Sequence, residues 1–365
     1  MLKILLYPLS LVYGLAVWIR NMLFDIHVFK QHEFNVPIIS VGNLTAGGTG
    51  KTPHAEYLIS LLKTKTNVAY LSRGYKRKTK GFVLATVHST LSDIGDEAVQ
   101  IKQKFPEIPV AVCEKREVGI RKLLKNQELD IDAIILDDAF QHRSVKANIN
   151  ILLIDYTRQI FNDHLLPYGR LREPTKAKYR ANFIVYTKCP PNIQPIEQRI
   201  IKNKLDIRPY QNLFFTTIVY GEITPAEKGL ALFNDNMQKY SVLLVTGIAN
   251  PEPLVDYLQP QVGEISHQKF PDHYNYTAAD LNKLVEQFQQ MEAKTKIILT
   301  TEKDLVRLKS MKDQPEHFFE QLYYIPIVIK FLDRTRDTFN KRILNYVTEN
   351  RSNSKVHSGK NQFQR

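Results

Sequence analysis

A glycine-rich loop that follows an apolar run constrains this chain more than any other feature of its sequence. Residues 45–52 read Thr-Ala-Gly-Gly-Thr-Gly-Lys-Thr, and residues 36–41 form the apolar run before them. Glycines in such a loop let backbone N–H groups point at a polyphosphate, while Lys51 reaches phosphate oxygens and the Thr52 hydroxyl can ligate Mg²⁺. The pattern G-x-x-x-x-G-K-[ST] is met except at Thr45. The segment predicts a nucleoside triphosphate site formed by Thr45, Ala46, Gly47, Gly48, Thr49, Gly50, Lys51 and Thr52.

Apolar runs of strand length recur after this loop and are separated by charged stretches that can form helices. The runs cover residues 68–71, 108–112, 131–136, 149–154 and 183–186. Continuous apolar runs of this kind are typical of parallel strands that are buried on both faces. We therefore predict an α/β fold with a mainly parallel sheet, helices on both faces, and ligands at the carboxyl ends of the strands.

A polar, proline-bearing stretch at residues 190–209 indicates a junction, after which a second α/β segment is expected. Its predicted strands are residues 213–220, 242–246, 297–300 and 323–329, and its closing helix is 335–348. The division that follows is an N-terminal helix at 1–29, a core with the phosphate loop at 30–205, a smaller α/β unit at 206–350, and a disordered basic tail at 351–365.

The first twenty residues and the net charge indicate a membrane surface. Residues 4–19 carry no charged side chain, but this run is shorter than the roughly 20 apolar residues that a spanning helix needs. A secretory signal is disfavoured because Lys3 is the single cation before the run and no Ala-x-Ala site follows. We predict an interfacial helix with Tyr13 and Trp18 at headgroup depth; the alternative is a helix packed against the body of the protein.

The net charge of +13 favours polyanionic partners, which include phosphates, nucleic acid and anionic lipid. Cys113 and Cys189 lie far apart without metal-ligand spacing, as expected of buried thiols in a reducing compartment. No helicase-like motif and no basic strand interleaved with aromatic residues is present, so we expect no nucleic-acid partner. No feature of the sequence indicates an obligate protein partner.

Acidic residues stand where the metal of a bound nucleotide would lie. Asp137 and Asp138 directly follow the apolar run 131–136, as in a Walker B element, and can hold Mg²⁺ directly or through water. Asp96, in Gly-Asp-Glu at 95–97, is either a general base or the N-cap of the next helix, and the local pattern alone favours the cap. His273 can orient a catalytic carboxylate, although a lone histidine among aromatic residues is more often structural.

Basic side chains cluster in two loop-like segments. Arg170, Arg172 and Glu173 lie within four residues, and Arg73 precedes the lysines of residues 76–80. Arginine forks favour phosphate or carboxylate ligands, whereas solvated surface charge is the alternative. Residues 300–304, Thr-Thr-Glu-Lys-Asp, either complete a pocket or cap a helix.

Taken together, these segments resemble the tetraacyldisaccharide 4'-kinase family, the lipid A 4'-kinases of Gram-negative bacteria. The resemblance covers nearly the whole chain, and one departure is Ala139, where the family often has glycine. It rests on residues 41–53, Ser72-Arg73-Gly74-Tyr75, Gly95-Asp96-Glu97, Leu136-Asp137-Asp138-Ala139-Phe140-Gln141-His142, Leu166-Pro167, Gly169-Arg170-Leu171-Arg172-Glu173, Gly247-Ile248-Ala249-Asn250-Pro251, Asp272-His273 and Thr301-Glu302-Lys303-Asp304.

The resemblance implies transfer of the ATP γ-phosphoryl group to the 4'-hydroxyl of a tetraacylated glucosamine disaccharide 1-phosphate, which gives lipid IVA. It implies that Asp96 is the base with His273 as its partner, and that the N-terminal helix sits on the cytoplasmic face of the inner membrane. Nucleotide and Mg²⁺ would be held by Lys51, Thr52, Asp137 and Asp138, and the site would be lined by Arg116, Gln141, His142 and Glu173.

A GTPase-like switch or metal-insertion protein is the main rival, because its phosphate loop also follows a strand. Thr187-Lys188 is similar to the centre of a guanine-reading Asn-Lys-x-Asp motif. Both outer residues of that motif are missing, so guanine specificity is not expected.

Overall fold

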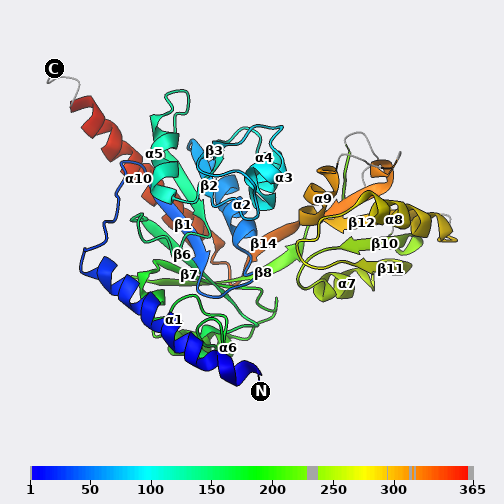
Figure 1. The fold of residues 1–365 in the computed structure, drawn as a ribbon, viewed down its shortest axis with the longest axis horizontal. Coiled ribbons are helices and arrows are strands. Elements are labelled where there is room, and N and C mark those ends of the chain that lie inside the picture. Colours follow the sequence, from blue (N-terminus) through cyan, green and yellow to red (C-terminus); the bar gives the residue numbers. More distant parts are fainter. Residues whose placement is uncertain (1, 228–236, 294, 312–314, 316–317, 361–365) are drawn as a thin grey trace.

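The computed structural model of the protein describes residues 2–227, 237–293, 295–311, 315 and 318–360, and contains two β-sheets covered by helices (Figure 1). The strands of the larger sheet are β1 (Ile38–Asn43), β2 (Val68–Ser72), β3 (Val83–Leu84), β4 (Val110–Val112), β5 (Ala133–Asp137), β6 (Ile149–Asp155), β7 (Phe183–Thr187), β8 (Asn212–Tyr220) and β14 (Ile327–Phe331). They are ordered β14-β8-β7-β6-β1-β5-β2-β4-β3, and only the edge strands β14 and β3 pair antiparallel. The predicted α/β fold with a mainly parallel sheet is confirmed.

Helices cover both faces of this sheet because successive strand residues face opposite sides. Ile39 of β1 packs with α2 (Lys51–Leu62), α4 (Asp96–Lys104) and α10 (Arg336–Lys360), together with the short α3 (Leu91–Ile94). Its neighbour Ile38 packs on the opposite face with α5 (Arg116–Lys125), and α6 (Pro195–Leu205) covers β6 and β7 on that face. Burial on both faces explains the continuous apolar runs.

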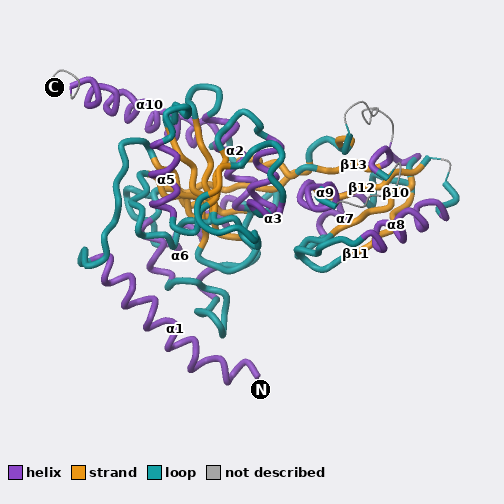
Figure 2. The backbone as a smooth tube through the Cα atoms, turned by 45° about the horizontal axis from the view of Figure 1, so that its top comes forward, coloured by secondary structure: helices purple, strands orange, loops and turns teal. Residues whose placement is uncertain are grey.

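The smaller sheet forms a second unit beside the first (Figure 2). Among the described residues its order is β11-β10-β12-β13-β9, and β9 pairs antiparallel with β13. Its strands are β9 (Thr224–Pro225), β10 (Ser241–Thr246), β11 (Glu264–Lys269), β12 (Lys296–Thr301) and β13 (Leu322–Ile325). Its helices are α7 (Glu252–Leu258) on one face and α8 (Ala278–Gln290) and α9 (Glu302–Lys309) on the other. Within the described residues, 3₁₀ turns lie at Ile160–Asn162, Thr175–Arg180, Met237–Lys239 and Phe319–Gln321.

The structure divides the chain differently from the predicted boundary at residue 205. The run 213–220, expected in the second unit, is β8 of the larger sheet, and the expected strand 323–329 is split at Pro326 between β13 and β14. Proline has no N–H for a continuing ladder, so the chain leaves the smaller sheet there and returns to the larger one. The Gly221 N–H donates to Pro326 O at 2.9 Å, so both connections between the units lie side by side.

Long helices lie at both ends of the chain. α1 (Leu2–Asp25) lies along the outside of the larger unit (Figure 1). Among the helices of the described residues, none is long and apolar enough to cross a membrane. At the other end, α10 continues past the predicted helix end at residue 348 to Lys360, and so into the segment predicted to be disordered. Residues 361–365 of that segment lie outside the described residues.

Candidate active site

The phosphate loop connects β1 to α2 at the carboxyl edge of the larger sheet. Gly47 and Gly50 have φ values of 116° and 83°, which glycine adopts without a steric penalty. Gly50 is the N-cap of α2, so the positive end of this helix dipole faces the loop. The loop is held from inside by Asn43, whose Nδ2 donates to Thr49 Oγ1 at 2.9 Å. This geometry suits an anion held by backbone N–H groups.

Neighbouring strands hold the loop from the other side. Thr187 Oγ1 donates to Thr49 O at 3.0 Å, and Lys188 Nζ donates to Gly48 O at 2.6 Å. Lys188 also pairs with Asp155 at the end of β6 at 2.8 Å. The Thr187-Lys188 pair therefore fixes the shape of the phosphate loop, a role that the sequence did not suggest.

Thr45 replaces the first glycine of the motif because the chain is extended at this point. It forms an antiparallel bridge with Leu171. On either side of that bridge, the Ala46 N–H donates to Arg170 O and the Arg172 N–H donates to Leu44 O, both at 2.7 Å. An extended residue needs no positive φ, so threonine fits. This pairing also brings the arginine segment to the phosphate loop.

The acidic pair stands at the end of β5, the strand beside β1. Asp137 is 1% exposed, its Oδ2 accepts a hydrogen bond from Tyr70 at 2.8 Å, and burial raises its pKa. Asp138 Oδ1 lies 2.8 Å from Arg172 Nη1 and 3.7 Å from Lys51 Nζ. Burial raises the pKa of Asp138, but Lys51 and Arg172 outweigh it, so the net pKa is lowered. Of the two carboxyl groups, Asp138 therefore has the lowered pKa and lies next to Lys51 of the phosphate loop.

The turn after this pair does not require the glycine that the family often has at position 139. The positive φ of the turn, 47°, belongs to Asp138, and Ala139 is not among the residues with positive φ. The Ala139 N–H donates to Val41 O at 3.2 Å. An alanine therefore fits the turn without strain.

Asp96 and His273 come together although they belong to different units. Asp96 Oδ2 lies 3.0 Å from His273 Nδ1 and accepts a hydrogen bond from Arg307 Nη2 at 2.9 Å. Burial raises the pKa of Asp96, but His273, Lys303 and Arg307 outweigh it and the net pKa lies well below its usual range. The N-cap interpretation of Asp96 is wrong, because Gly95 is the N-cap and Asp96 is the first residue of α4.

Two cations of α9, Lys303 and Arg307, contact His273. The sequence analysis did not identify Arg307. Lys303 Nζ lies 3.3 Å from His273 Nε2, and Arg307 Nη2 lies 3.1 Å from its Nδ1. Thr301 caps α9 by accepting from the Asp304 N–H at 3.1 Å, so the predicted capping of residues 300–304 is present. Arg307 lies one turn past Asp304 and pairs with it at 2.9 Å. This i,i+3 spacing of opposite charges is the signal in the sequence that could have indicated an ion pair on one face of the helix.

Glu97 connects the acidic pair with the Asp96 group. Its pKa is raised to about 7, first by burial and then by the charges of Asp137 and Asp96. Lys51 acts in the opposite direction. Gly95 lies against Gly74 and Tyr75, which follow the carboxyl end of β2, so Asp96 and the acidic pair stand at the same edge of the sheet.

The other predicted residues lie around this space in different ways. Arg116 is fully buried behind β5, where it donates to Cys113 O and to Asp137 O, and burial lowers its pKa to about 10. Burial and the nearby Arg116 lower the pKa of His142 to about 4, so His142 is neutral at physiological pH. Gln141 Nε2 donates to Asn43 O at 2.8 Å, and Arg73 is exposed at the end of β2.

The structure does not place Glu173 against the Lys51 and Asp138 group. Glu173 is fully buried between Arg180 and Arg20 of α1, and Arg20 also donates to Gln141 O. This group fastens α1 to the larger unit. The side chain of Arg170 is exposed. The contact of this residue with Asp163 is made by its backbone, whose N–H donates to Asp163 Oδ1 at 3.1 Å.

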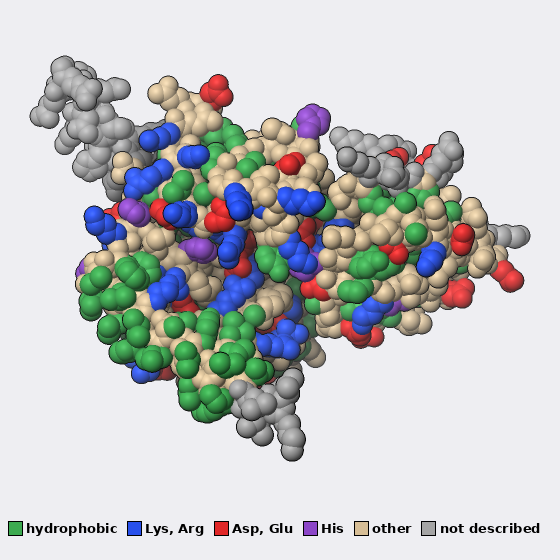
Figure 3. Space-filling model, in the orientation of Figure 1, with side chains coloured by type: hydrophobic (Ala, Val, Ile, Leu, Met, Phe, Trp, Pro, Cys, Tyr) green, Lys and Arg blue, Asp and Glu red, His purple; other side chains and the backbone are tan. Residues whose placement is uncertain are grey.

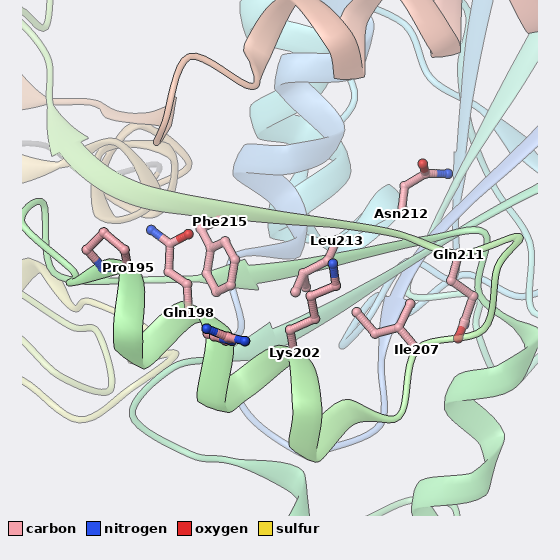
Figure 4. Close-up of a pocket in the computed structure, with 9 residues that line it drawn as sticks. Pro195, Gln198, Lys202, Ile207, Gln211, Asn212, Leu213 and Phe215 are labelled. Atoms are coloured by element: carbon pink, nitrogen blue, oxygen red, sulfur yellow. The ribbon is translucent and has the colours of Figure 1, made fainter.

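A separate cavity of about 390 Å³ lies between α6 and β8 (Figure 4). Its lining includes Pro195, Gln198, Lys202 and Phe215. None of the predicted site residues lines it.

A phosphate loop beside an acidic pair, with a carboxylate and a histidine across the same edge, defines a P-loop phosphotransferase. The family model described as tetraacyldisaccharide-1-P 4'-kinase matches residues 2–348. The chain belongs to the tetraacyldisaccharide 4'-kinase family, and the resemblance drawn from its motifs is confirmed.

Relatives and a solved structure agree with this assignment. The chain is 46% identical over 353 residues to the tetraacyldisaccharide 4'-kinase of Phocaeicola vulgatus, with 96% of each chain covered. It is 43% identical over 350 residues to that of Flavobacterium johnsoniae, covering 96% of this chain and 98% of the relative. A crystal structure of LpxK from Aquifex aeolicus, described as an apo form in complex with ATP, matches with a TM-score of 0.74 and 29% identity, over 94% of this chain and 99% of that one.

Proposed function

We propose that this protein transfers the γ-phosphoryl group of ATP to the 4'-hydroxyl of a tetraacyldisaccharide 1-phosphate, which yields lipid IVA and ADP in lipid A biosynthesis. The observation that carries the proposal is the meeting of Asp96 and His273 at 3.0 Å, in a chain whose relatives from Phocaeicola vulgatus and Bacteroides fragilis are named tetraacyldisaccharide 4'-kinases. The GTPase alternative is disfavoured by those relatives.

The phosphate loop and Lys51 would bind the triphosphate. The Thr52 hydroxyl and the carboxylates of Asp137 and Asp138 would hold Mg²⁺, which typically takes one or two carboxylates and otherwise water and phosphate oxygens. Asp138 fits this role because its lowered pKa keeps it ionised. The bound ion would neutralise charge on the phosphoryl group during transfer. Lys51, already 3.7 Å from Asp138, would stabilise the same charge.

Asp96 would accept the proton of the attacking hydroxyl. The 4'-oxygen forms its bond to the γ-phosphorus while the bond from that phosphorus to the β–γ bridging oxygen breaks, the proton passes to Asp96 as the new bond forms, and ADP leaves. With its lowered pKa, Asp96 stays ionised and orients the hydroxyl, taking the proton as the oxygen becomes acidic in a loose transition state. His273 and Arg307 hold the accepting carboxylate in place. Arg73, Arg170 and Arg172 are candidates for the 1-phosphate end of the acceptor, and Arg116, Gln141, His142 and Glu173 for supporting the site.

We further propose that α1 lies in the interface of the inner membrane on its cytoplasmic face, as a peripheral anchor. Its inner side is tied to the protein, since Ser10 Oγ donates to Leu165 O at 2.8 Å and Tyr13 OH to Arg172 O at 2.9 Å. Its outer side exposes large apolar residues, and such side chains gather over α1 in Figure 3. They are Tyr7, Leu9, Leu11, Val12, Leu15, Trp18 and Ile19.

Insertion of these side chains into lipid removes their apolar surface from water and so favours membrane binding. Burial of one large aliphatic or aromatic side chain is worth about 1.5–3 kcal/mol. The net charge of +13 adds attraction to anionic headgroups. The Arg20–Glu173 ion pair fastens α1 to the larger unit. A lipid substrate that stays in the bilayer would then approach the phosphate loop from the side of the protein that carries α1.

The direct test is incubation of the detergent-solubilised protein with ATP, Mg²⁺ and tetraacyldisaccharide 1-phosphate, followed by mass analysis of the lipid. One added phosphoryl group, with GTP a poor substitute for ATP, is the expected result. An unmodified lipid under conditions where the protein binds ATP would overturn the proposed reaction.

A further inference from the structure

The two units touch along α4 and α9, which run antiparallel with opposite charges at both ends. At one end, Asp96 begins α4 and pairs with Arg307 near the end of α9 at 2.9 Å. At the other end, Lys104 closes α4 and pairs with Glu302, the first residue of α9, at 2.9 Å. We call this second contact, with its partners Glu56 and Gln100, the Lys104 clasp.

The clasp also reaches the helix that follows the phosphate loop. Lys104 Nζ pairs with Glu56 Oε2 at 2.7 Å, and Gln100 Nε2 donates to Glu56 Oε1 at 2.7 Å. Glu56 lies one turn beyond Thr52 on α2 and is only 5% exposed. One ammonium group therefore bridges the nucleotide helix, the helix of the candidate base and the smaller unit.

The charges at the clasp depend on Lys104. Burial and the nearby Glu302 raise the pKa of Glu56 to about 7. Burial lowers the pKa of Lys104, but the carboxylates of Glu56 and Glu302 outweigh it and the net pKa is raised. Without the ammonium, α9 would lose its ion pair with α4 and its bridge to α2, and Glu56 would be left buried without its charged partner.

We propose that Lys104 is a positioning residue for phosphoryl transfer, because the clasp sets the docking of α9 that holds His273 on Asp96. α9 carries Lys303 and Arg307, the two cations that contact His273. A shift of α9 against α4 therefore changes the Asp96–His273 geometry while the phosphate loop remains intact. This inference rests on the roles proposed above for Asp96 and His273.

The first experiment compares Lys104→Met with Lys102→Met. Lys102 lies on the same helix but donates to the carbonyls of Pro106 and Ile108 within its own unit. Lys104→Met should lower kcat by about tenfold, a size typical of coupling between neighbouring charges, with the KM for ATP changed by less than about twofold. Lys102→Met should keep the kcat of the unmodified protein. Equal kcat values in both variants would overturn the proposal.

The second experiment exchanges the charges, because a single change can also act through stability. Lys104→Glu leaves three acids together, and Glu302→Lys leaves two cations against Glu56, so each should lower kcat. The double variant restores one cation between two acids, with the cation now on α9, and should recover kcat to within about threefold of the unmodified protein. Glu252→Lys, at the start of α7 and paired with Lys269 on the surface, is the matched control for Glu302→Lys.

Melting temperatures of all variants separate misfolding from mispositioning. A double variant as slow as the worse single variant, at a melting temperature equal to that of the unmodified protein, would contradict the clasp. The proposed function is tested independently by Asp96→Asn. If Asp96→Asn loses activity while the Lys104 variants do not, the inference fails and the function stands; if Asp96→Asn stays active, the function itself fails.

Discussion

Asp96 and Arg307 are 211 positions apart in the chain and lie 2.9 Å from each other across the two units. The guanidinium is fixed on its own side by Gly247 O and Asp304 Oδ1, both at 2.9 Å from Nη1. Its charge is one of those that keep the pKa of Asp96 low against the effect of burial. The ionisation of the candidate base therefore depends on the docking of the smaller unit.

Removal of Arg307 should move the acid limb of the activity profile to higher pH. Arg307→Met deletes a cation that lowers the pKa of Asp96 and leaves burial, which raises it. Only the ionised carboxylate accepts a proton, so activity should fall earlier on acidification. The measurement is the loss of kcat on acidification from about pH 8 to about pH 4, which should be larger in Arg307→Met than in the control Arg336→Met, whose Nε donates to Tyr57 OH on the surface. An acid limb at the same pH in both variants would contradict the assigned role of Asp96.

Asp96→Asn should lower kcat by about 10²–10⁴, the range typical of a lost general base, and leave the fold in place. The amide cannot accept the hydroxyl proton but keeps nearly the same shape on His273 and Arg307. Asp93→Asn is the matched control, because Asp93 lies one turn away and only caps α3 through Thr90. Steady-state kinetics and melting temperatures of the two variants decide the point, and a slow Asp93→Asn variant would indicate a structural cause for both.

Lys51→Met should lower kcat by about 10²–10³, as is typical when one preorganised group for transition-state charge is removed. Lys51 also helps to keep the pKa of Asp138 low, so its loss weakens the nearby acid as well. Lys63→Met at the end of the same helix is the control, since Lys63 pairs with Glu107 on the surface at 2.7 Å. Turnover in Lys51→Met equal to that of the control would exclude the phosphate-binding role.

The parts of the site that the sequence predicts are those in which neighbouring residues act together. The phosphate loop and the Asp137-Asp138 pair each follow an apolar run, so a strand and its carboxyl end place them without knowledge of the rest. Asp96 and His273 were joined only through the family resemblance, because no local pattern links residues of different units. Arg307 was missed for the same reason.

The parallel strands are predicted because each is a local apolar run. The errors in the predicted domain boundary arise where a strand pairs with a distant part of the chain. A parallel strand that is buried on both faces appears in the sequence as a continuous apolar run. The place of the edge strand β14 in the larger sheet is defined instead by its antiparallel pairing with β8. Register with a strand more than a hundred residues away is not encoded locally. The split at Pro326 was readable in principle, since proline interrupts a ladder.

Polar substitutions on the outer face of α1 should weaken membrane binding. Leu11→Ser, Val12→Ser and Leu15→Ser together remove three of its exposed apolar side chains and should lower sedimentation with anionic liposomes by at least about tenfold, given about 1.5–3 kcal/mol for each fully inserted side chain. Ile196→Ser with Ile200→Ser is the control, because these residues are exposed on α6 instead. Equal losses in the two variants would argue for scattered apolar contacts rather than an anchor at α1.

Glu56→Gln should flatten the dependence of stability on pH between about pH 4.5 and about pH 7. The pKa of Glu56 is about 7 in the folded protein, against an ordinary value of 4.5. In this window the folded state holds a proton that the unfolded chain has released, so its contribution to the free energy of unfolding is complete below pH 4.5 and is lost as the pH rises through 7. Lys104 and Glu302 face the group, and the raised pKa of Lys104 keeps its ammonium charged across this window.

The comparison isolates Glu56 even though another buried acid titrates in the same range. The pKa of Glu97 is also raised to about 7, so Glu97 gives a slope of the same sign in both proteins and cancels in their difference. Urea unfolding at several pH values gives the free energies of unfolding, and the difference between the proteins should change in one direction from about pH 4.5 to about pH 7. A constant difference would mean that Glu56 is ionised throughout, and that the ammonium of Lys104 outweighs burial at the clasp.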